Sequence, residues 1–386
     1  MRGLTTIIVL SGFLLDHSHL LGSAIDSNST VFIIVMENHN WSSIKGSASA
    51  PYINNTLPPM ASYCDQYYNP PAIHPSLPSY LWLEAGTGFG ITNDSPPSVN
   101  HQATTNHFVT RLKNAGISWK TYQENISGAT CPTTDSYPYY VKHNPFAYFD
   151  DVVASGCTSV MRPFTELATD LANQSAAHYN FITPNICNDM HDSCAPTSNS
   201  ILQGDNWLAQ NVPTILNSSA YQNNGLLFIT WDEGAGSSDG PIGMIVLSPR
   251  AKAGGYHNAL PYTHSSTIRT LQKIFGDEPP LDGAATALDL SDLFLPGAIP
   301  NADPQVAIKE VFRSVSGTPI RWTTQPALPT GSNGRQRSMR LRGRQSLPTS
   351  PGPAASFPGQ MMEARRADSP PKSAFTGWLS RRHSSS

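Results

Sequence analysis

Four short segments of the chain are continuously apolar or β-branched and end abruptly in polar residues. They are 30–36 (TVFIIVM), 178–184 (HYNFITP), 225–231 (GLLFITW) and 243–249 (GMIVLSP). An uninterrupted apolar run of this length is typical of a strand that is buried on both faces of a parallel sheet. Open α/β sheets bind ligands at the carboxyl ends of their strands. We therefore expect a functional site where these four segments turn polar.

Apolar residues at helical spacing lie between these strands. The predicted helices are 107–115, 164–172, 206–216 and 265–275, and the first and last of them are followed by a glycine, as many helices are. Strands that alternate with helices predict a three-layer α/β/α domain with a mostly parallel central sheet. The sequence contains no internal repeat.

The C-terminal segment 317–386 differs from the rest of the chain in composition. It is rich in Pro, Ser, Gly and Arg, and we predict that it is a disordered tail. It holds 11 Lys and Arg against 2 Asp and Glu, so the rest of the chain has a formal net charge near −12. An acidic body argues against nucleic acid as a partner, because phosphate backbones are bound by clustered Lys and Arg. The basic tail could contact an acidic surface, although a solvated tail without a partner is the simpler interpretation.

The N-terminus has the features of an export signal. Arg2 precedes an apolar stretch over 4–15, and small residues follow at 22–24, so we predict a signal peptide over 1–24. An ordinary first strand is the alternative. The apolar stretch is too short to span a bilayer, and the polar C-terminus lacks the hydrophobic segment of a lipid-anchor signal. We expect a secreted protein, extracellular or in the cell wall, without stable membrane insertion, whose catalytic domain covers 25–316.

Two further features fit an oxidising compartment. Seven Asn-x-Ser/Thr triplets predict glycosylation at several of these positions: Asn28, Asn40, Asn54, Asn93, Asn125, Asn173 and Asn217. Five cysteines suit disulfide formation, and the candidate pairs are Cys187 with Cys194 and Cys131 with Cys157. Cys64 is left without a partner.

Acidic and amide side chains follow two of the predicted strands. Glu37 and Asn38 come directly after 30–36, and Asp232 and Glu233 come directly after 225–231. Carboxylate and amide oxygens are suitable ligands for a divalent cation. Each pair also has an ordinary interpretation, as a helix cap or a surface turn.

Hydroxyl and imidazole groups occur in three other short motifs. Ser76 lies between two prolines at the predicted start of a helix, where unpaired N–H groups favour a phosphate, and His74 precedes it. The loop NICNDMHDSC contains Asp189 and His191, and His264 precedes the helix 265–275. Ser76 could instead be an N-cap, and each histidine could be an ordinary hydrogen-bonded residue.

Seven motifs together resemble one known family. In chain order they are VFIIVMENHNW, APYINNTLPPMA, HPSLPSYLWLEAGTGFGI, AGISWKTYQENISG, TPNICNDMHD, ITWDEG and YTHSSTIRTLQKIFG. Their order and spacing are similar to those of the phosphoesterase family that contains secreted fungal acid phosphatases and bacterial phospholipases C. The resemblance covers about 31–294 and implies an alkaline-phosphatase-like fold, with a metal site at the carboxyl edge of the sheet.

The resemblance also implies roles for individual residues. The metal ligands would be Glu37, Asn38, Asp232 and Glu233, with Glu233 at a position where longer relatives have Asp. Ser76 would be the nucleophile, and His191 would contact phosphate and act as general acid, with His264 in support. His74, Ser79 and Asp189 are the expected substrate contacts. Many members have Asn where this chain has Ser79, so we expect altered substrate contacts.

The predicted function is therefore a secreted acid phosphatase that depends on a divalent metal cation of unknown identity. Ser76 would attack the phosphate of a small-molecule monoester, and water would then hydrolyse the phosphoserine. A histidine that acts as an acid must be protonated, which predicts an acidic optimum. A phospholipase C that cleaves phosphodiesters is the alternative enzyme. A secreted binding protein that keeps the fold without activity is the alternative outside enzymes. The sequence leaves the oligomeric state open.

Overall fold

The computed structural model describes residues 23–236 and 238–302. Most of the predicted signal peptide 1–24 and the whole predicted tail 317–386 lie outside the described residues. The predicted domain boundary at 316 also lies outside them. In the described part of the chain, no helix has the length and apolar character needed to cross a membrane.

An eight-stranded sheet forms the centre of the domain. Its strand order is β5 (Met161–Pro163), β4 (Trp119–Gln123), β6 (Tyr179–Thr183), β1 (Val31–Met36), β7 (Leu226–Trp231), β8 (Met244–Leu247), β2 (Ala61–Cys64) and β9 (Tyr256–Asn258). Neighbouring strands are parallel except where β8 lies between β7 and β2. A separate parallel pair is formed by β3 (Tyr67–Tyr68) and β10 (Tyr262–Thr263).

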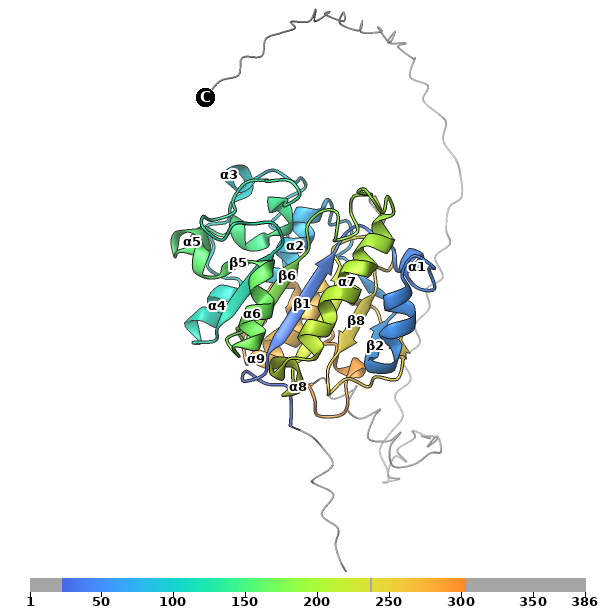
Figure 1. Cartoon of the computed structure of the whole chain (residues 1–386). Helices are drawn as coiled ribbons and strands as arrows, with labels where there is room; N and C mark the ends of the chain where they lie inside the picture. The colour runs from blue at the N-terminus through green and yellow to red at the C-terminus, as the bar shows by residue number, and fades with distance from the viewer. Residues whose placement is uncertain (1–22, 237, 303–386) are drawn as a thin grey trace, which may run out of the picture. The chain divides into compact units, whose positions relative to one another are not determined.

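Helices cover both faces of this sheet. Figure 1 shows α6 (Leu167–Ala172) and α7 (Ser200–Leu216) in front of the sheet, and α2 (Ser76–Ala85) and α9 (His264–Phe275) behind it. The helix α4 (Phe108–Asn114) packs beside α9, through the rings of Phe108 and Phe275. The short helices are α1 (Trp41–Ile44), α3 (Pro97–Asn100), α5 (Asp150–Ala154) and α8 (Ser219–Gln222). The predicted three-layer α/β class with a mostly parallel sheet is confirmed.

The predicted elements agree with the structure apart from two corrections. The helix predicted over 206–216 begins earlier, at Ser200, because the Asn199 side chain accepts a hydrogen bond from Leu202 N at 3.0 Å and caps it. The strand predicted over 243–249 is β8, which is antiparallel to β7. Its end therefore points to the edge opposite the other strand ends, where Ser248 Oγ donates to Gly225 O at the start of β7.

The register between β1 and β7 determines where the site residues lie. All six residues of each strand are buried, and Met36 pairs with Trp231 at the carboxyl ends. Buried apolar side chains on both faces hold these strands in the sheet. The next residues along each chain, Glu37 and Asp232, therefore emerge side by side.

The predicted disulfides are both present. Cys131 pairs with Cys157 and Cys187 pairs with Cys194, each with a Cα–Cα distance of 5.6 Å. Cys64 is a buried thiol whose Sγ donates to Leu260 O. The disulfide between Cys187 and Cys194 closes the loop after β6 that carries the predicted residue His191.

The predicted glycosylation positions differ in how accessible their amides are. Asn54 uses its side chain inside the fold, because Nδ2 donates to Ile44 O and Ala50 O and Oδ1 accepts from Gly46 N. A glycan at Asn54 would require these hydrogen bonds to break. Asn40 is half-buried, and the remaining five positions are exposed: Asn28, Asn93, Asn125, Asn173 and Asn217.

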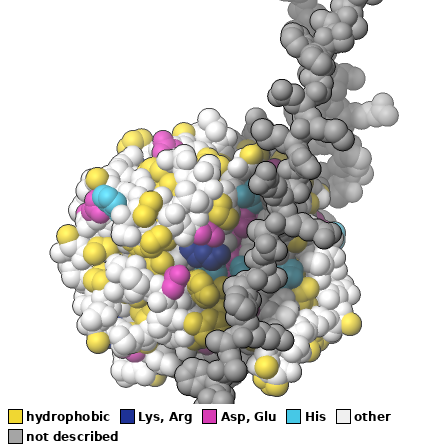
Figure 2. All heavy atoms as spheres, turned by 90° about the horizontal axis from the view of Figure 1, so that it is seen from above, with side chains coloured by type: hydrophobic (Ala, Val, Ile, Leu, Met, Phe, Trp, Pro, Cys, Tyr) yellow, Lys and Arg dark blue, Asp and Glu magenta, His cyan; other side chains and the backbone are white. Residues whose placement is uncertain are grey.

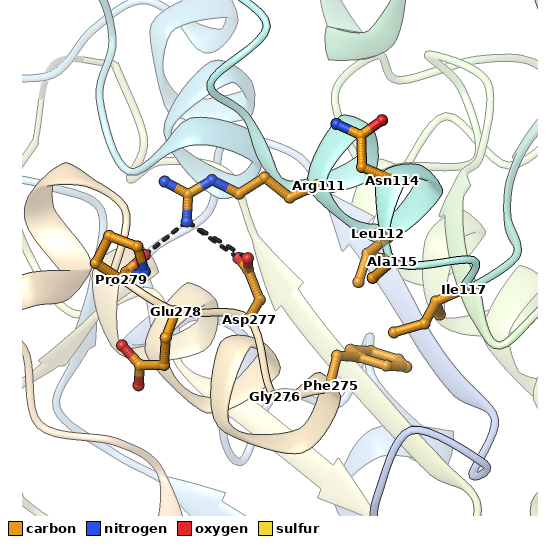
Figure 3. Close-up of a pocket in the computed structure, with 10 residues that line it drawn as sticks. All are labelled: Arg111, Leu112, Asn114, Ala115, Ile117, Phe275, Gly276, Asp277, Glu278 and Pro279. Atoms are coloured by element: carbon orange, nitrogen blue, oxygen red, sulfur yellow. Dashed lines mark hydrogen bonds and ion pairs between the residues drawn. The ribbon is translucent and has the colours of Figure 1, made fainter.

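A groove of about 510 Å³ lies between the C-terminal ends of α4 and α9. Figure 3 shows Arg111 reaching across it to Asp277 and to the carbonyl of Pro279. The groove lies at the opposite end of α9 from His264, and a helix of this length spans about 18 Å. It is therefore separate from the site at the carboxyl edge of the sheet.

A buried cluster ties α2 to its neighbours. His107 is fully buried, with Nδ1 2.8 Å from Glu84 Oε1 and Nε2 3.1 Å from Asp151 Oδ1. Glu84, on α2, also accepts a hydrogen bond from Val109 N of α4. Burial lowers the pKa of His107, but the hydrogen bond and charge of Glu84 and the charge of Asp151 outweigh it, so the pKa is raised. The cluster therefore stabilises the fold when His107 is protonated.

The stability of the protein should depend on pH through His107. A raised folded-state pKa gives stability that is present below the unfolded value of about 6.5 and is lost as pH rises through the folded-state pKa. His107→Gln should lower the free energy of unfolding by about 3 kcal/mol near pH 5, and by less near pH 9. Urea unfolding at both values measures this difference.

The matched control for this experiment is His101→Gln. The side chain of His101 is 55% exposed and pairs with Asp150 at the surface. A surface pair contributes less than about 1 kcal/mol. An effect of His107→Gln that is the same at both pH values would contradict the assignment of the charge to His107.

Candidate active site

The carboxyl ends of β1 and β7 bring three predicted metal ligands together. Glu37 and Asp232 are fully buried, and Asn38 N donates to Asp232 Oδ1 at 3.0 Å. Asn38 has a φ of 48°, a left-handed conformation that asparagine tolerates better than most residues. This turn directs the chain away from the sheet immediately after β1, so that Glu37 and Asn38 stay at its edge.

Ser76 is the first residue of α2 and points at this acidic group. Its Oγ donates to Glu37 Oε2 at 3.1 Å. The N-cap position belongs to Pro75, and Ser76 makes no capping bond. The structure therefore does not support the alternative of Ser76 as an N-cap.

A third strand end contributes Asp189, and a short 3₁₀ turn contributes His143. Asp189 is fully buried in the loop after β6, and its carbonyl accepts a hydrogen bond from Glu37 N at 2.7 Å. His143, in the turn η4 (Val141–His143), lies with Nε2 3.2 Å from Glu37 Oε1 and Nδ1 3.2 Å from Asp189 Oδ2. Its ring stacks on Tyr80 of α2 with a centroid distance of 5.3 Å. Glu37 thus faces Ser76 with one oxygen and His143 with the other.

The donor set at this point fits a divalent cation. Five buried polar atoms of this donor set lack hydrogen-bond partners among the described residues: Glu37 Oε1, Asn38 Oδ1, His143 Nε2, Asp189 Oδ2 and Asp232 Oδ2. Ligand atoms of Glu37, His143 and Asp189 lie within 4.8 Å of one another. Unpaired buried polar atoms are costly in a folded protein, and a cation would satisfy oxygen and imidazole donors of this kind.

The carboxyl groups affect one another strongly. Burial raises the pKa of Glu37, Asp189 and Asp232. Burial, followed by the charges of Asp232 and Asp94, raises the pKa of Glu233 to about 9. Carboxylates that are buried together disfavour each other's charged form. A bound cation would reverse this effect by neutralising the cluster.

His191 lies at the rim of the site, on the loop closed by Cys187 and Cys194. Its backbone N donates to Asp189 Oδ1 at 2.8 Å, and its ring Nδ1 lies 2.7 Å from Asp192 Oδ1. Its ring centroid is 6.1 Å from that of His143. The side chain is 28% exposed, and Nε2 has no hydrogen-bond partner among the described residues. This arrangement leaves one ring nitrogen available to a ligand.

His264 does not have the exposure that a proton donor needs. It is fully buried, with Nε2 2.6 Å from Asp232 O and Nδ1 3.0 Å from Tyr67 Oη. Burial lowers the pKa of His264 to about 4. Both ring nitrogens are already hydrogen-bonded, so the geometry favours a positioning role toward Asp232 over the predicted catalytic one.

Two predicted substrate contacts also support other site residues. The His74 ring contacts Glu233 through Nδ1 and Asp239 through Nε2. Ser79 is fully buried one helical turn after Ser76, and its Oγ donates to Ile73 O at 3.3 Å. These partners place His74 and Ser79 around the loop that leads to Ser76.

Three residues near the site were missed by the sequence analysis: His143, Lys142 and Asp94. Asp94 Oδ1 accepts a hydrogen bond from Leu77 N, and its Oδ2 holds Lys142 Nζ at 3.0 Å. None of them follows an apolar strand or forms a motif with a neighbouring acid. Viewed toward this edge of the sheet, Lys or Arg atoms lie between Asp or Glu and His side chains near the middle of the face (Figure 2). Only the folded structure shows that His143, Lys142 and Asp94 lie near the site.

The family model named "Phosphoesterase family" matches residues 59–277. The chain belongs to the Phosphoesterase family. It is thus a phosphoric ester hydrolase, as the sequence predicted. The match includes Ser76, Asp189, His191, Asp232 and His264, and Glu37 and Asn38 lie just before it.

Two relatives illustrate the similarity. A "Phosphatidylinositol-3-phosphatase" of Mycobacterium tuberculosis is 31% identical over 71% of this chain and 86% of its own length. An "Acid phosphatase" of Aspergillus fumigatus is 30% identical over 53% of this chain and 46% of its own length. The chain therefore spans most of the mycobacterial relative and less than half of the fungal one.

Among solved structures, the chain is similar to a protein of the alkaline phosphatase superfamily from Vibrio parahaemolyticus. The TM-score is 0.45 at 10% identity, with 70% of this chain and 72% of that chain covered. The lipoteichoic acid synthase LtaP from Listeria monocytogenes gives a TM-score of 0.47 at 10% identity, with 68% of this chain and 75% of that one covered.

Cation binding should stabilise the protein. After chelation with EDTA, a saturating excess of Mn²⁺, Zn²⁺ or Mg²⁺ should raise the melting temperature, because about 100 times the dissociation constant adds about 2.7 kcal/mol to the folded state. Asp232→Asn should abolish most of this shift, since it removes a charge from the donor set. Differential scanning fluorimetry measures the shift without any substrate.

The control for cation binding is Asp170→Asn. Asp170 pairs with Lys120 outside the site, so this variant should keep the full shift in melting temperature. The shift should also weaken as pH falls, because the carboxyl groups bind protons in competition with the cation. Equal shifts in wild type and Asp232→Asn would contradict the proposed donor set.

Proposed function

We propose that the protein is a secreted, metal-dependent phosphomonoesterase that works through a phosphoserine at Ser76. The observation that carries this proposal is the hydrogen bond of 3.1 Å between Ser76 Oγ and Glu37 Oε2, inside a buried group of carboxylates. A serine hydroxyl so placed has an acceptor for its proton and lies beside donors that suit a cation. The names of the relatives support the phosphatase assignment, since those cited are all phosphatases.

The residues that would hold the metal form one continuous donor set. They are Glu37, Asn38, Asp189, Asp232 and His143, with Glu233 beside Ser76. When bound, a divalent cation would neutralise phosphoryl oxygens and depress the pKa of a hydroxyl beside it. Asp189 and His143 enlarge the set expected from the sequence, and Asp189 changes from a substrate contact to a metal ligand or a support for one.

In the first step, Ser76 Oγ attacks phosphorus in line with the ester bond. The Oγ–P bond forms, the ester P–O bond breaks, and the hydroxyl proton passes toward Glu37 Oε2. Ser76 begins α2, whose first-turn N–H groups and helix dipole favour the negative charge of the phosphoryl group. The helix is long enough, from Ser76 to Ala85, to hold the nucleophile in a fixed position.

His191 is the proposed proton donor to the leaving alcohol. Asp192 orients the ring through Nδ1, and Nε2 is left to face a substrate. In the second step water attacks the phosphoserine and gives a proton to the same nitrogen. The Ser76 Oγ–P bond breaks, Oγ takes back the proton that had passed toward Glu37 Oε2, and phosphate is released. A proton donor must carry its proton, which agrees with the acidic optimum predicted from the sequence.

A phospholipase C uses the same residues, so the alternative must be tested with substrates. Comparison of p-nitrophenyl phosphate with p-nitrophenyl phosphorylcholine distinguishes a monoesterase from a phosphodiesterase. The phosphatase names of the relatives favour the monoesterase. A binding protein without activity would show no turnover of either compound.

Replacement of the nucleophile should remove the activity. Ser76→Ala should lower kcat for p-nitrophenyl phosphate at least about a thousandfold, as loss of a covalent nucleophile usually does. The variant should keep the shift in melting temperature with Mn²⁺, since Ser76 is not the main source of ligand atoms. The matched control is Ser155→Ala, which removes a hydroxyl that bonds only locally to Val152 O. Turnover by Ser76→Ala at the rate of the wild type would refute the phosphoserine mechanism.

The role of His191 should depend on the leaving group. In His191→Gln, kcat for phenyl phosphate should fall about a hundredfold, because phenolate is a poor leaving group that needs a proton. The loss for p-nitrophenyl phosphate should be smaller than about tenfold, because p-nitrophenolate leaves without protonation. The control is His178→Gln, because His178 directly precedes β6 and its Nδ1 lies 2.8 Å from Ser118 Oγ. Equal losses for both esters would rule out His191 as the acid.

A further inference from the structure

The side-chain ammonium of Lys142 is a positive charge near the proposed nucleophile, Ser76. Its Nζ lies 3.0 Å from Asp94 Oδ2, while Asp94 Oδ1 accepts a hydrogen bond of 3.0 Å from Leu77 N. Leu77 directly follows Ser76, so a chain of two hydrogen bonds connects the Lys142 ammonium to the first turn of α2. Lys142 also directly precedes His143, which faces Glu37. The Lys142 ammonium is thus linked to α2 through Asp94, and its backbone is linked to the site through His143.

The charge of Lys142 acts on the whole carboxylate group. Burial raises the pKa of Glu37, Asp189, Asp232 and Glu233, and the positive charge of Lys142 opposes the rise at each of them. A lysine ammonium is ordinarily charged at neutral pH, so its positive charge acts on these carboxylates.

Partial exposure makes this charge accessible to a ligand. The Lys142 side chain is 17% exposed and the Asp94 side chain is 27% exposed. The pair therefore lies at the entrance of the site, whereas the carboxylates behind it are buried. A lysine ammonium carries three N–H donors, and Asp94 is the only hydrogen-bond partner of Lys142 Nζ among the described residues. N–H donors of Lys142 therefore remain for a ligand at the entrance of the site.

We propose that Lys142 binds the phosphoryl group of the substrate and selects phosphomonoesters over phosphodiesters. This inference rests on the proposed function and assigns to that same site a determinant of substrate class. A monoester carries up to two negative charges on its terminal oxygens, whereas a diester carries one. A fixed ammonium favours the more highly charged group, because Coulomb attraction grows with the charge of the partner.

Asp94 should weaken the attraction of Lys142 for phosphate. In the free protein its carboxylate neutralises part of the ammonium charge, and a phosphate group would compete with it for Lys142. Asp94→Asn keeps an oxygen that can accept the hydrogen bond from Leu77 N, but it removes the competing charge. The two residues should therefore affect phosphate binding in opposite directions.

The test measures inorganic phosphate as a competitive inhibitor of p-nitrophenyl phosphate hydrolysis. Lys142→Gln should raise the inhibition constant of phosphate about tenfold, as expected for loss of one charge-assisted hydrogen bond. Asp94→Asn should lower that constant, and Lys142→Arg should restore most of the wild-type value. Lys142→Gln should also lower kcat/KM more for p-nitrophenyl phosphate than for bis(p-nitrophenyl) phosphate.

The matched control is Lys120→Gln. Lys120 is a lysine of similar exposure, 23%, that pairs with Asp170 away from the site, and its removal should leave the inhibition constant unchanged. The shift in melting temperature with Mn²⁺ shows whether each variant is folded. A purely structural role for Lys142 would lower stability without any change in phosphate inhibition or in the monoester to diester ratio, and that outcome would overturn the proposal.

Ser76→Ala separates this inference from the proposed function. If Ser76→Ala is inactive while Lys142→Gln behaves as wild type toward phosphate, the phosphomonoesterase proposal stands and the role of Lys142 is refuted. If Ser76→Ala remains fully active, the nucleophile is misassigned whatever Lys142 does.

Discussion

The buried carboxylate cluster at the carboxyl edge of the sheet is the constraint on which the rest of the site depends. Glu37, Asp189 and Asp232 are each fully removed from solvent, although charged groups are expensive to bury. Several of their oxygens have no hydrogen-bond partner among the described residues. A fold keeps such a group only where something compensates for it, and a divalent cation is the partner that this donor set fits best.

Three histidines help to hold this cluster: His264, predicted as catalytic, His74, predicted as a substrate contact, and His143, which the sequence did not identify. His264 donates through Nε2 to the Asp232 carbonyl and accepts through Nδ1 from Tyr67 Oη, and His74 contacts Glu233. His143 lies between Glu37 and Asp189 and stacks on Tyr80 of the helix that begins with Ser76. Packing and hydrogen bonds around a site fix the geometry that catalysis requires. Of the two histidines predicted as catalytic, only His191, partly exposed at the rim, keeps a ring nitrogen without a hydrogen-bond partner among the described residues.

The electrostatic balance of the site connects metal binding with substrate choice. An acidic cluster without a cation would repel a phosphate ester, because both are negative. A bound metal and the ammonium of Lys142 would together make the mouth of the site attractive to a phosphoryl group. The α2 helix adds its N-terminal dipole at the same point. The proposed nucleophile, the proposed cation site and Lys142 are thus arranged around the start of α2.

The sequence by itself determined the strands and the polar residues that follow them. Continuous apolar runs identified β1, β6 and β7, and the residues directly after β1 and β7 carry the acids, because burial of a strand fixes what emerges at its end. Local spacing cannot give the direction of a strand in the sheet. The end of β8 was therefore placed at the wrong edge, since only its pairing with β7 shows that it runs the other way.

Tertiary structure alone decided which distant side chains meet and which nitrogens remain available. His143, Lys142 and Asp94 come from loops and turns far from any buried strand, so no periodicity marks them, yet packing of η4 against α2 brings them to Ser76. Sequence likewise could not distinguish His264, buried with both nitrogens bonded, from His191, exposed with one nitrogen unpaired among the described residues. Burial and hydrogen bonding are properties of the folded environment, and they decide whether the same imidazole positions a carboxylate or transfers a proton.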